Sequence, residues 1–180
     1  MTHKSSTDSY GSVAIGVHWL TAVLIVGLLA SGVLAENAAD PATKATLLTL
    51  HAPMGIAVLV LTLFRIVWWW RLDTRPDPLG GNPAWQEKLA KAVHLLLYMV
   101  MIGMAASGIG MFVLSGSGDI LFGGAPGPLP DFDNFAPRGP HGIGAKLLMA
   151  LLVLHAGAAL YHHFLRRDAT LRRMWFASTK

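Results

Sequence analysis

The chain has 180 residues, of which 53% are hydrophobic and only 13% are charged, and its formal net charge is +4. This length fits one domain covering residues 1–180, but the charged fraction is too small for the surface of a typical soluble domain. The composition therefore predicts a membrane protein and argues against nucleic-acid binding, which needs a basic surface exposed to water. The absence of cysteine excludes disulfides, thiolate ligands and iron–sulfur clusters.

Four apolar segments are long enough to cross a bilayer, which takes about 20 helical residues. They are residues 13–35, 45–70, 89–114 and 141–165. The first segment is longer than the roughly 7 to 15 residues of a signal-peptide core, so we expect it to stay in the mature protein. The sequence thus predicts an all-α membrane protein, a bundle of four transmembrane helices.

Basic residues are divided unevenly between the two sides of this bundle. One side carries Lys4, Arg71, Arg75, Lys88, Lys91, Arg166, Arg167, Arg172, Arg173 and Lys180. The other carries Lys44, Arg138 and Lys146. Because Lys and Arg close to membrane spans are retained on the cytoplasmic side, we expect both termini to be cytoplasmic.

The connections and their flanks are less informative. Residues 115–140 are rich in Gly, Pro and Asp, which predicts an irregular loop that packs on the bundle as a lid. Residues 68–70 are three tryptophans in front of Arg71, a pattern typical of an interfacial aromatic belt. The sequence predicts no internal repeat.

Histidines are the unusual feature of the four segments. The segments contain no Asp or Glu, but they contain His18, His51, His94, His141, His155 and His162. Ionisable side chains inside a membrane are energetically unfavourable, so they indicate function. A proton-coupled or metal transporter would be expected to use carboxylates, whereas neutral imidazole suits haem iron.

The predicted topology sorts most of these histidines into two layers. His51 and His141 fall near the outer side, and His18, His94 and His155 fall near the inner side. His141 and His155 are 14 residues apart, which is roughly 21 Å along a helix and within about 40° of the same face. This spacing suits a helix that gives one axial ligand to each of two haems. The outer pair is then His51 with His141, while the inner site has three candidates for two positions.

At this point the chain resembles the bacterial cytochrome b561 family, and within it the superoxide oxidase type. The resemblance covers nearly the whole chain and is strongest in LHAGAALYHHFLRRDATLRRM, residues 154–174. It also includes His18 with Trp19, LHAPMG at residues 50–55, and Phe64 with Arg65. Two positions depart from the pattern of many members, namely Ala52 in place of Lys and Ala105 in place of Pro.

The resemblance implies two haem b groups, held non-covalently in a bacterial inner membrane. It implies that His18 and His155 ligate the inner haem iron and that His51 and His141 ligate the outer one. It further implies oxidation of superoxide outside and reduction of ubiquinone inside. His94 and His162 are then candidates for the quinone site, because both lie near the inner layer and an imidazole can exchange protons.

A second hypothesis has the same cofactors and a different direction of transfer. In it the protein oxidises quinol and reduces a periplasmic protein partner, which docks on residues 115–140. The outer loops are acidic overall, and this argues against strong attraction of anionic superoxide.

Overall fold

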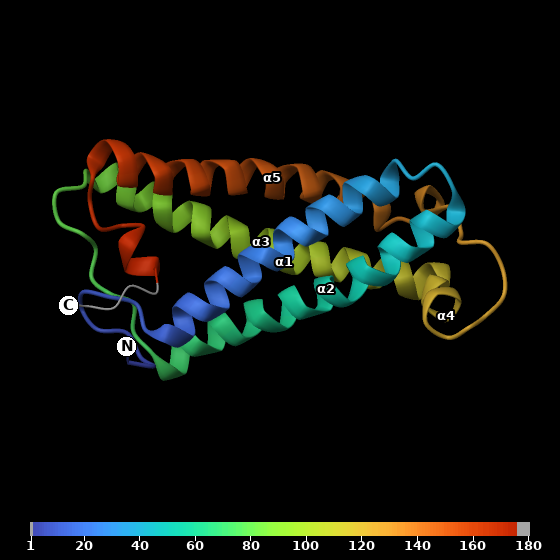
Figure 1. The fold of residues 1–180 in the computed structure, drawn as a ribbon, viewed down its shortest axis with the longest axis horizontal. Helices are drawn as coiled ribbons and strands as arrows, with labels where there is room; N and C mark the ends of the chain where they lie inside the picture. Colours follow the sequence, from blue (N-terminus) through green and yellow to red (C-terminus); the bar gives the residue numbers. More distant parts are fainter. Residues whose placement is uncertain (1, 176–180) are drawn as a thin grey trace.

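The computed structural model describes residues 2–175, and every element in that range is a helix (Figure 1). The four long helices are α1 (Ser12–Glu36), α2 (Pro41–Val67), α3 (Ala84–Ser115) and α5 (Arg138–Tyr161). All four are long and apolar enough to cross a membrane, so the predicted four-helix membrane bundle is confirmed. Counted with the π-helical turns that follow α2 and α5, the spans are Ser12–Glu36, Pro41–Leu72, Ala84–Ser115 and Arg138–Arg166, and each extends slightly beyond its predicted segment.

Two helical hairpins make up the bundle. α1 packs chiefly on α2, α3 packs chiefly on α5, and contacts between α2 and α3 join the two hairpins. A small apolar core near the middle of the bundle draws on all four helices, with Ile25, Val58, Val93, Leu97, Met101, Leu148 and Leu151. The core separates the two ends of the bundle, where the histidines lie.

Local sequence explains where the helices begin and end. Asp40 caps α2 by accepting a 2.9 Å hydrogen bond from the Thr43 amide, and Pro41 follows it at the first helical position. α3 ends at Gly116, whose φ of 66° favours glycine. α2 and α5 both finish in a π-helical turn, η1 (Trp68–Leu72) and η3 (His162–Arg166).

The two ends of the bundle differ in how they are built (Figure 1). We call one the tail end, formed by residues 2–11, 73–83 and 167–175, and the other the loop end, formed by residues 37–40 and 116–137. At the tail end the Arg173 guanidinium donates to three carbonyl oxygens, those of Thr7, Asp8 and Asp77, at 2.7–3.0 Å. The Trp19 indole donates to the carbonyl of Met174 at 2.7 Å. These bonds tie both termini and the α2–α3 connection together.

The loop-end segment is more regular than the sequence suggests. The predicted irregular loop over residues 115–140 contains a short helix, α4 (Ser117–Leu121), and a 3-10 turn, η2 (Phe132–Asn134). The prediction is wrong here because Gly116 turns the chain and lets a helix restart at once. Its packing on the bundle is confirmed, since the Phe122 ring lies 6.3 Å from that of Phe112 on α3, and the Lys44 amine lies 5.9 Å from the Phe132 ring.

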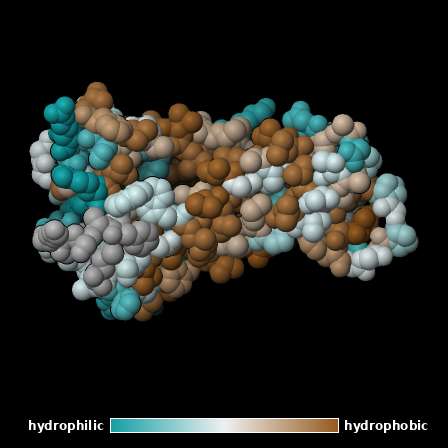
Figure 2. All heavy atoms as spheres, in the orientation of Figure 1, coloured by the Kyte–Doolittle hydropathy of each residue, from teal (hydrophilic) through white to brown (hydrophobic). Residues whose placement is uncertain are grey.

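The surface fits a lipid environment. Figure 2 shows hydrophobic side chains across the middle of the visible face and hydrophilic ones more often toward the two ends. Val23 and Val153, for example, are 68% and 74% exposed in the middle of α1 and α5. Apolar side chains exposed at this depth face lipid rather than water.

Candidate functional site

The loop end brings together the predicted pair His51 and His141. His51 extends from α2 and His141 from α5, and their ring centroids lie 6.2 Å apart with 61° between the ring planes. The two hairpins therefore contribute one imidazole each.

Each of these rings is held by a serine on the neighbouring helix of its own hairpin. Ser31 Oγ lies 3.0 Å from Nδ1 of His51, and Ser107 Oγ lies 2.9 Å from Nδ1 of His141. Each serine hydroxyl donates its proton to a main-chain carbonyl, that of Leu28 or of Met104. The hydroxyls must therefore accept from Nδ1–H, which leaves the lone pair of Nε2 on each ring free to bind a metal.

A glycine follows each serine and allows this close approach. A β-carbon at Gly32 would lie 3.3 Å from Cε1 of His51, and one at Gly108 would lie 3.4 Å from Cε1 of His141. A larger residue at either position would push the imidazole away. The loop-end pair thus sits in two matching Ser-Gly cradles.

The tail end brings three predicted histidines together. The His155 ring centroid lies 6.1 Å from that of His18 and 5.2 Å from that of His94. Nδ1 of His94 lies 2.6 Å from the carbonyl oxygen of Ala90 one turn earlier, so it donates, and Nε2 carries the lone pair. We call these three residues the tail-end cluster.

The distances allow a test of whether these rings could share a metal. Metal–imidazole bonds are about 2.0–2.1 Å long, and about 1 Å more separates each nitrogen from its ring centre, so two rings on opposite sides of one ion should have centroids roughly 6 Å apart. The pairs His51–His141 and His18–His155 both match this value. His94 lies closer to His155, almost perpendicular to it at 86°.

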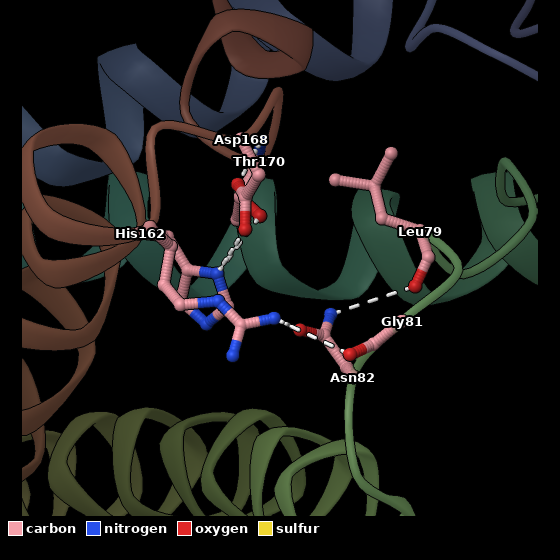
Figure 3. Close-up of polar contacts among 7 residues, drawn as sticks. Leu79, Gly81, Asn82, His162, Asp168 and Thr170 are labelled. Atoms are coloured by element: carbon pink, nitrogen blue, oxygen red, sulfur yellow. Dashed lines mark hydrogen bonds and ion pairs between the residues drawn. The ribbon is translucent and has the colours of Figure 1, made fainter.

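His162 lies apart from the tail-end cluster and has its own partners (Figure 3). Its Nδ1 donates to Oδ2 of Asp168 at 2.5 Å, and Thr170 supports the carboxylate through a 2.8 Å bond from its amide to Oδ1. Partial burial alone would raise the pKa of Asp168, but hydrogen bonds from His162 and Thr170 outweigh it and lower the pKa to about 2. The carboxylate therefore stays charged and directs Nε2 of His162 away from itself.

The turn η3 places a basic side chain beside His162. Arg166 donates to the carbonyl of Gly81 at 3.3 Å and to Oδ1 of Asn82 at 3.2 Å, in the α2–α3 connection (Figure 3). The chain then leaves the π turn through Arg167, whose φ is 54°. Arg166, four residues after His162, thus ties the end of α5 to the connection.

Comparison with known proteins matches this arrangement. The family model described as prokaryotic cytochrome b561 matches residues 9–177. The chain belongs to the prokaryotic cytochrome b561 family.

Curated relatives extend over nearly the whole chain of this cytochrome b561 family member. Cytochrome b561 homolog 1 of Escherichia coli is 30% identical over 173 residues, 93% of this chain and 97% of the relative. Probable superoxide oxidase CybB of Yersinia pestis is 31% identical over 169 residues, 92% of this chain and 94% of the relative. Cytochrome b562 of Cereibacter sphaeroides is 29% identical over 170 residues, 92% of this chain and 94% of the relative. The chain is accordingly a membrane electron-transfer protein of a haem b family.

The cytochrome b561 fold also contains polar groups that the sequence analysis did not assign. Ser31, Ser107 and Asp168 each hold a candidate histidine, and Arg65 lies within electrostatic range of His18, His94 and His155. The two Ser-Gly pairs were a usable signal, because the same dipeptide occurs on both helices that face the loop-end histidines. Asp168 gave no signal, since its contact depends on a turn after α5.

A basic side chain at the loop end of this cytochrome b561 family member is paired with acidic ones. Arg138 forms ion pairs with Glu36 at 2.6 Å and with Asp133 at 3.2 Å. Its charge is thereby compensated twice. The basic side chains predicted on this side therefore do not form a strong cationic surface.

Proposed function

We propose that this protein binds two haem b groups, one at each end of the bundle. His51 and His141 would be the axial ligands at the loop end, and His18 and His155 those at the tail end. The observation that carries the proposal is the match between the two pairs, whose ring centroids are 6.2 and 6.1 Å apart. His94 is left out, because its ring centroid lies only 5.2 Å from that of His155, closer than two rings on opposite sides of one ion should be.

Haem b with two imidazole ligands supplies a one-electron carrier with no open position for oxygen. The side chains have the remaining tasks. Ser31 and Ser107 fix the tautomers at the loop end, and the apolar core between the two histidine layers keeps water out of the middle of the bundle.

The tail end is proposed to face the cytoplasm of a bacterium, with the inner membrane as the location. It carries most of the basic side chains, including Arg71, Arg75, Arg166 and Arg173. The loop end carries few, and Arg138 is already paired. Retention of basic residues on the cytoplasmic side supports this orientation.

The proposed reaction takes electrons from superoxide at the loop end and delivers them to ubiquinone at the tail end. Two superoxide anions give two electrons and become two O2 molecules, and one ubiquinone takes the two electrons with two protons to become ubiquinol. The similarity to probable superoxide oxidase CybB supports this choice.

His162 is the better of the two candidates for the quinone site. Nδ1–H is engaged by Asp168, so Nε2 can hydrogen-bond a quinone oxygen and exchange protons with it. His94 contacts Ala90 and His155 instead, which puts it beside the proposed haem ligand. His94 is therefore the weaker candidate for the quinone site at this end of the bundle.

One observation favours a second candidate function. The paired Arg138 and the surrounding carboxylates make the loop end a poor attractor of an anion, but such a surface suits a basic protein partner. The protein would then oxidise quinol at the tail end and reduce a periplasmic protein that docks on residues 115–140.

The test uses purified protein in detergent. A pyridine haemochrome assay should give two b haems per chain, and one or none would refute the ligand pairing. A superoxide pulse should reduce the haem faster than buffer controls and then yield ubiquinol when ubiquinone is present. Absence of superoxide-driven reduction, together with rapid haem reduction by quinol, would replace the first function with the second.

A further inference from the structure

The structure reveals an internal repeat, which corrects the sequence analysis. α1 and α3 carry the same residues at the same spacing. The matching pairs are Val17 and Val93, His18 and His94, Leu20 and Leu96, Gly27 and Gly103, Ala30 and Ala106, Ser31 and Ser107, and Gly32 and Gly108. The hairpin α1–α2 is therefore equivalent to the hairpin α3–α5.

Contacts fix the equivalence of the second helices. His51 on α2 and His141 on α5 each meet the serine and glycine of their own hairpin. Counting from these histidines, Arg65 is as far along α2 as His155 is along α5. The repeat thus puts a guanidinium on α2 where α5 carries a proposed haem ligand.

The surroundings of Arg65 agree with this position. It lies within electrostatic range of His18, His94 and His155. Its guanidinium carbon lies 5.9 Å from the centre of the Tyr98 ring on α3. Arg65 therefore belongs to the tail-end layer, inside the turn that carries the interfacial tryptophans.

Arg65 lacks an acceptor for its charge among residues 2–175. Its Nε is buried without a hydrogen-bond partner, and no carboxylate in that range forms an ion pair with it. A guanidinium does not lose its proton in proteins, and an uncompensated charge in a membrane is strongly unfavourable. The position calls for an anion that residues 2–175 do not supply.

We propose that Arg65 binds a propionate carboxylate of the tail-end haem. The inference rests on the proposed ligation by His18 and His155, because haem b carries two carboxylates on its edge and this edge must lie near its axial ligands. A guanidinium and a carboxylate form a charge-assisted, often bidentate hydrogen bond. A lipid phosphate is the weaker candidate for the anion at Arg65. Arg71 and Arg75 follow in the same chain segment and lie closer to the membrane interface, where lipid phosphates are found.

The test measures how fast the tail-end haem is lost to an excess of a haem-scavenging protein. Protein made in haem-deficient cells is reconstituted with haem b or with haem b dimethyl ester, whose propionates are neutral. With haem b, Arg65→Gln should lose the tail-end haem about tenfold faster than the wild type, because a charged hydrogen bond is gone. Arg65→Lys should recover part of this retention. With the ester, wild type and Arg65→Gln should lose haem at the same rate.

Controls separate this contact from other effects. Arg71→Gln removes the same positive charge six residues further along the chain. It should leave the rate of haem loss unchanged, because the Arg71 guanidinium stacks on the Trp70 ring at 4.0 Å. Equal loss of haem b from wild type and Arg65→Gln would overturn the proposal, as would an Arg65→Gln effect that persists with the ester. A wild type that binds no tail-end haem would instead refute the ligand assignment under the proposed function.

Discussion

The hydroxyl of Ser31 accepts a hydrogen bond from Nδ1–H of His51 and donates one to the carbonyl oxygen of Leu28. Ser107 does the same for His141, with Met104 as the acceptor. Neither His18 nor His155 makes such a bond within residues 2–175, so the two proposed haem sites differ in how their ligands are held. This difference would give the two proposed haems distinct electronic environments.

Removal of either serine hydroxyl should change the loop-end haem alone. A hydrogen bond from Nδ1–H makes the imidazole a stronger donor and favours oxidised iron, so Ser31→Ala should raise the midpoint potential. We expect a rise of about 30–60 mV, a roughly three- to tenfold change in the equilibrium for one electron. Spectroelectrochemical titration of purified protein measures both haems at once.

Ser107→Ala should give the same shift as Ser31→Ala, because the two cradles are equivalent. Ser115→Ala is a suitable control, since the hydroxyl of Ser115 bonds to Ser117 and touches neither ring. Unequal shifts for the two cradle variants, or a shift of the other haem, would speak against the assignment of the loop-end ligands.

Gly32 should be intolerant of a methyl group, whereas Gly103 on α3 should accept one. A β-carbon at Gly32 would lie 3.3 Å from Cε1 of His51, closer than an ordinary contact, but one at Gly103 meets nothing within 4 Å. Gly32→Ala should weaken binding of the loop-end haem about tenfold, in the range typical of disturbed contacts to a ligating histidine. Haem content per chain after gel filtration, compared with Gly103→Ala, measures the effect; equal content in both would contradict the cradle.

The sequence predicted the bundle and much of the proposed site because both depend on periodicity. Apolar runs locate the spans, and fourteen residues of helix return His155 to the face of His141. The serine and glycine cradles depend on which helix faces meet, and periodicity does not specify this. Small residues on α1 and α3 have a common explanation in close helix packing, so the repeat they mark became visible only through their contacts.

Asp168 is expected to position His162, and Asp168→Asn tests this. The variant keeps an oxygen acceptor but loses the charge that holds Nδ1–H, so quinone reduction should fall about tenfold. Haem reduction by superoxide and both haem spectra should remain unchanged. Steady-state assays with a short-chain ubiquinone separate an effect on KM from one on kcat.

The pH dependence follows from the sign of the Asp168 shift. Its folded pKa is lowered from 3.8 to about 2, so its contribution is complete above pH 3.8 and is lost only as the pH falls toward 2. Titration of Asp168 therefore should not shape the activity between about pH 5 and 8. Asp8→Asn is a control that removes a carboxylate at the same end of the bundle. Asp8 bonds to Arg173 through its main-chain oxygen and not its side chain, so this variant should behave like the wild type.

Salt should not slow the reaction with superoxide. Arg138 is compensated by Glu36 and Asp133, so the loop end presents net negative charge to an anionic substrate. Raising the ionic strength from about 0.01 to 0.15 M shortens the Debye length from about 30 to 8 Å, and this should leave the rate unchanged or raise it up to about twofold.

Glu36→Gln frees part of the Arg138 charge and should increase the rate about twofold at low salt, while Glu87→Gln at the tail end should not. Stopped-flow haem reduction measures these rates, and a steep fall with salt would show that a cationic surface attracts superoxide after all.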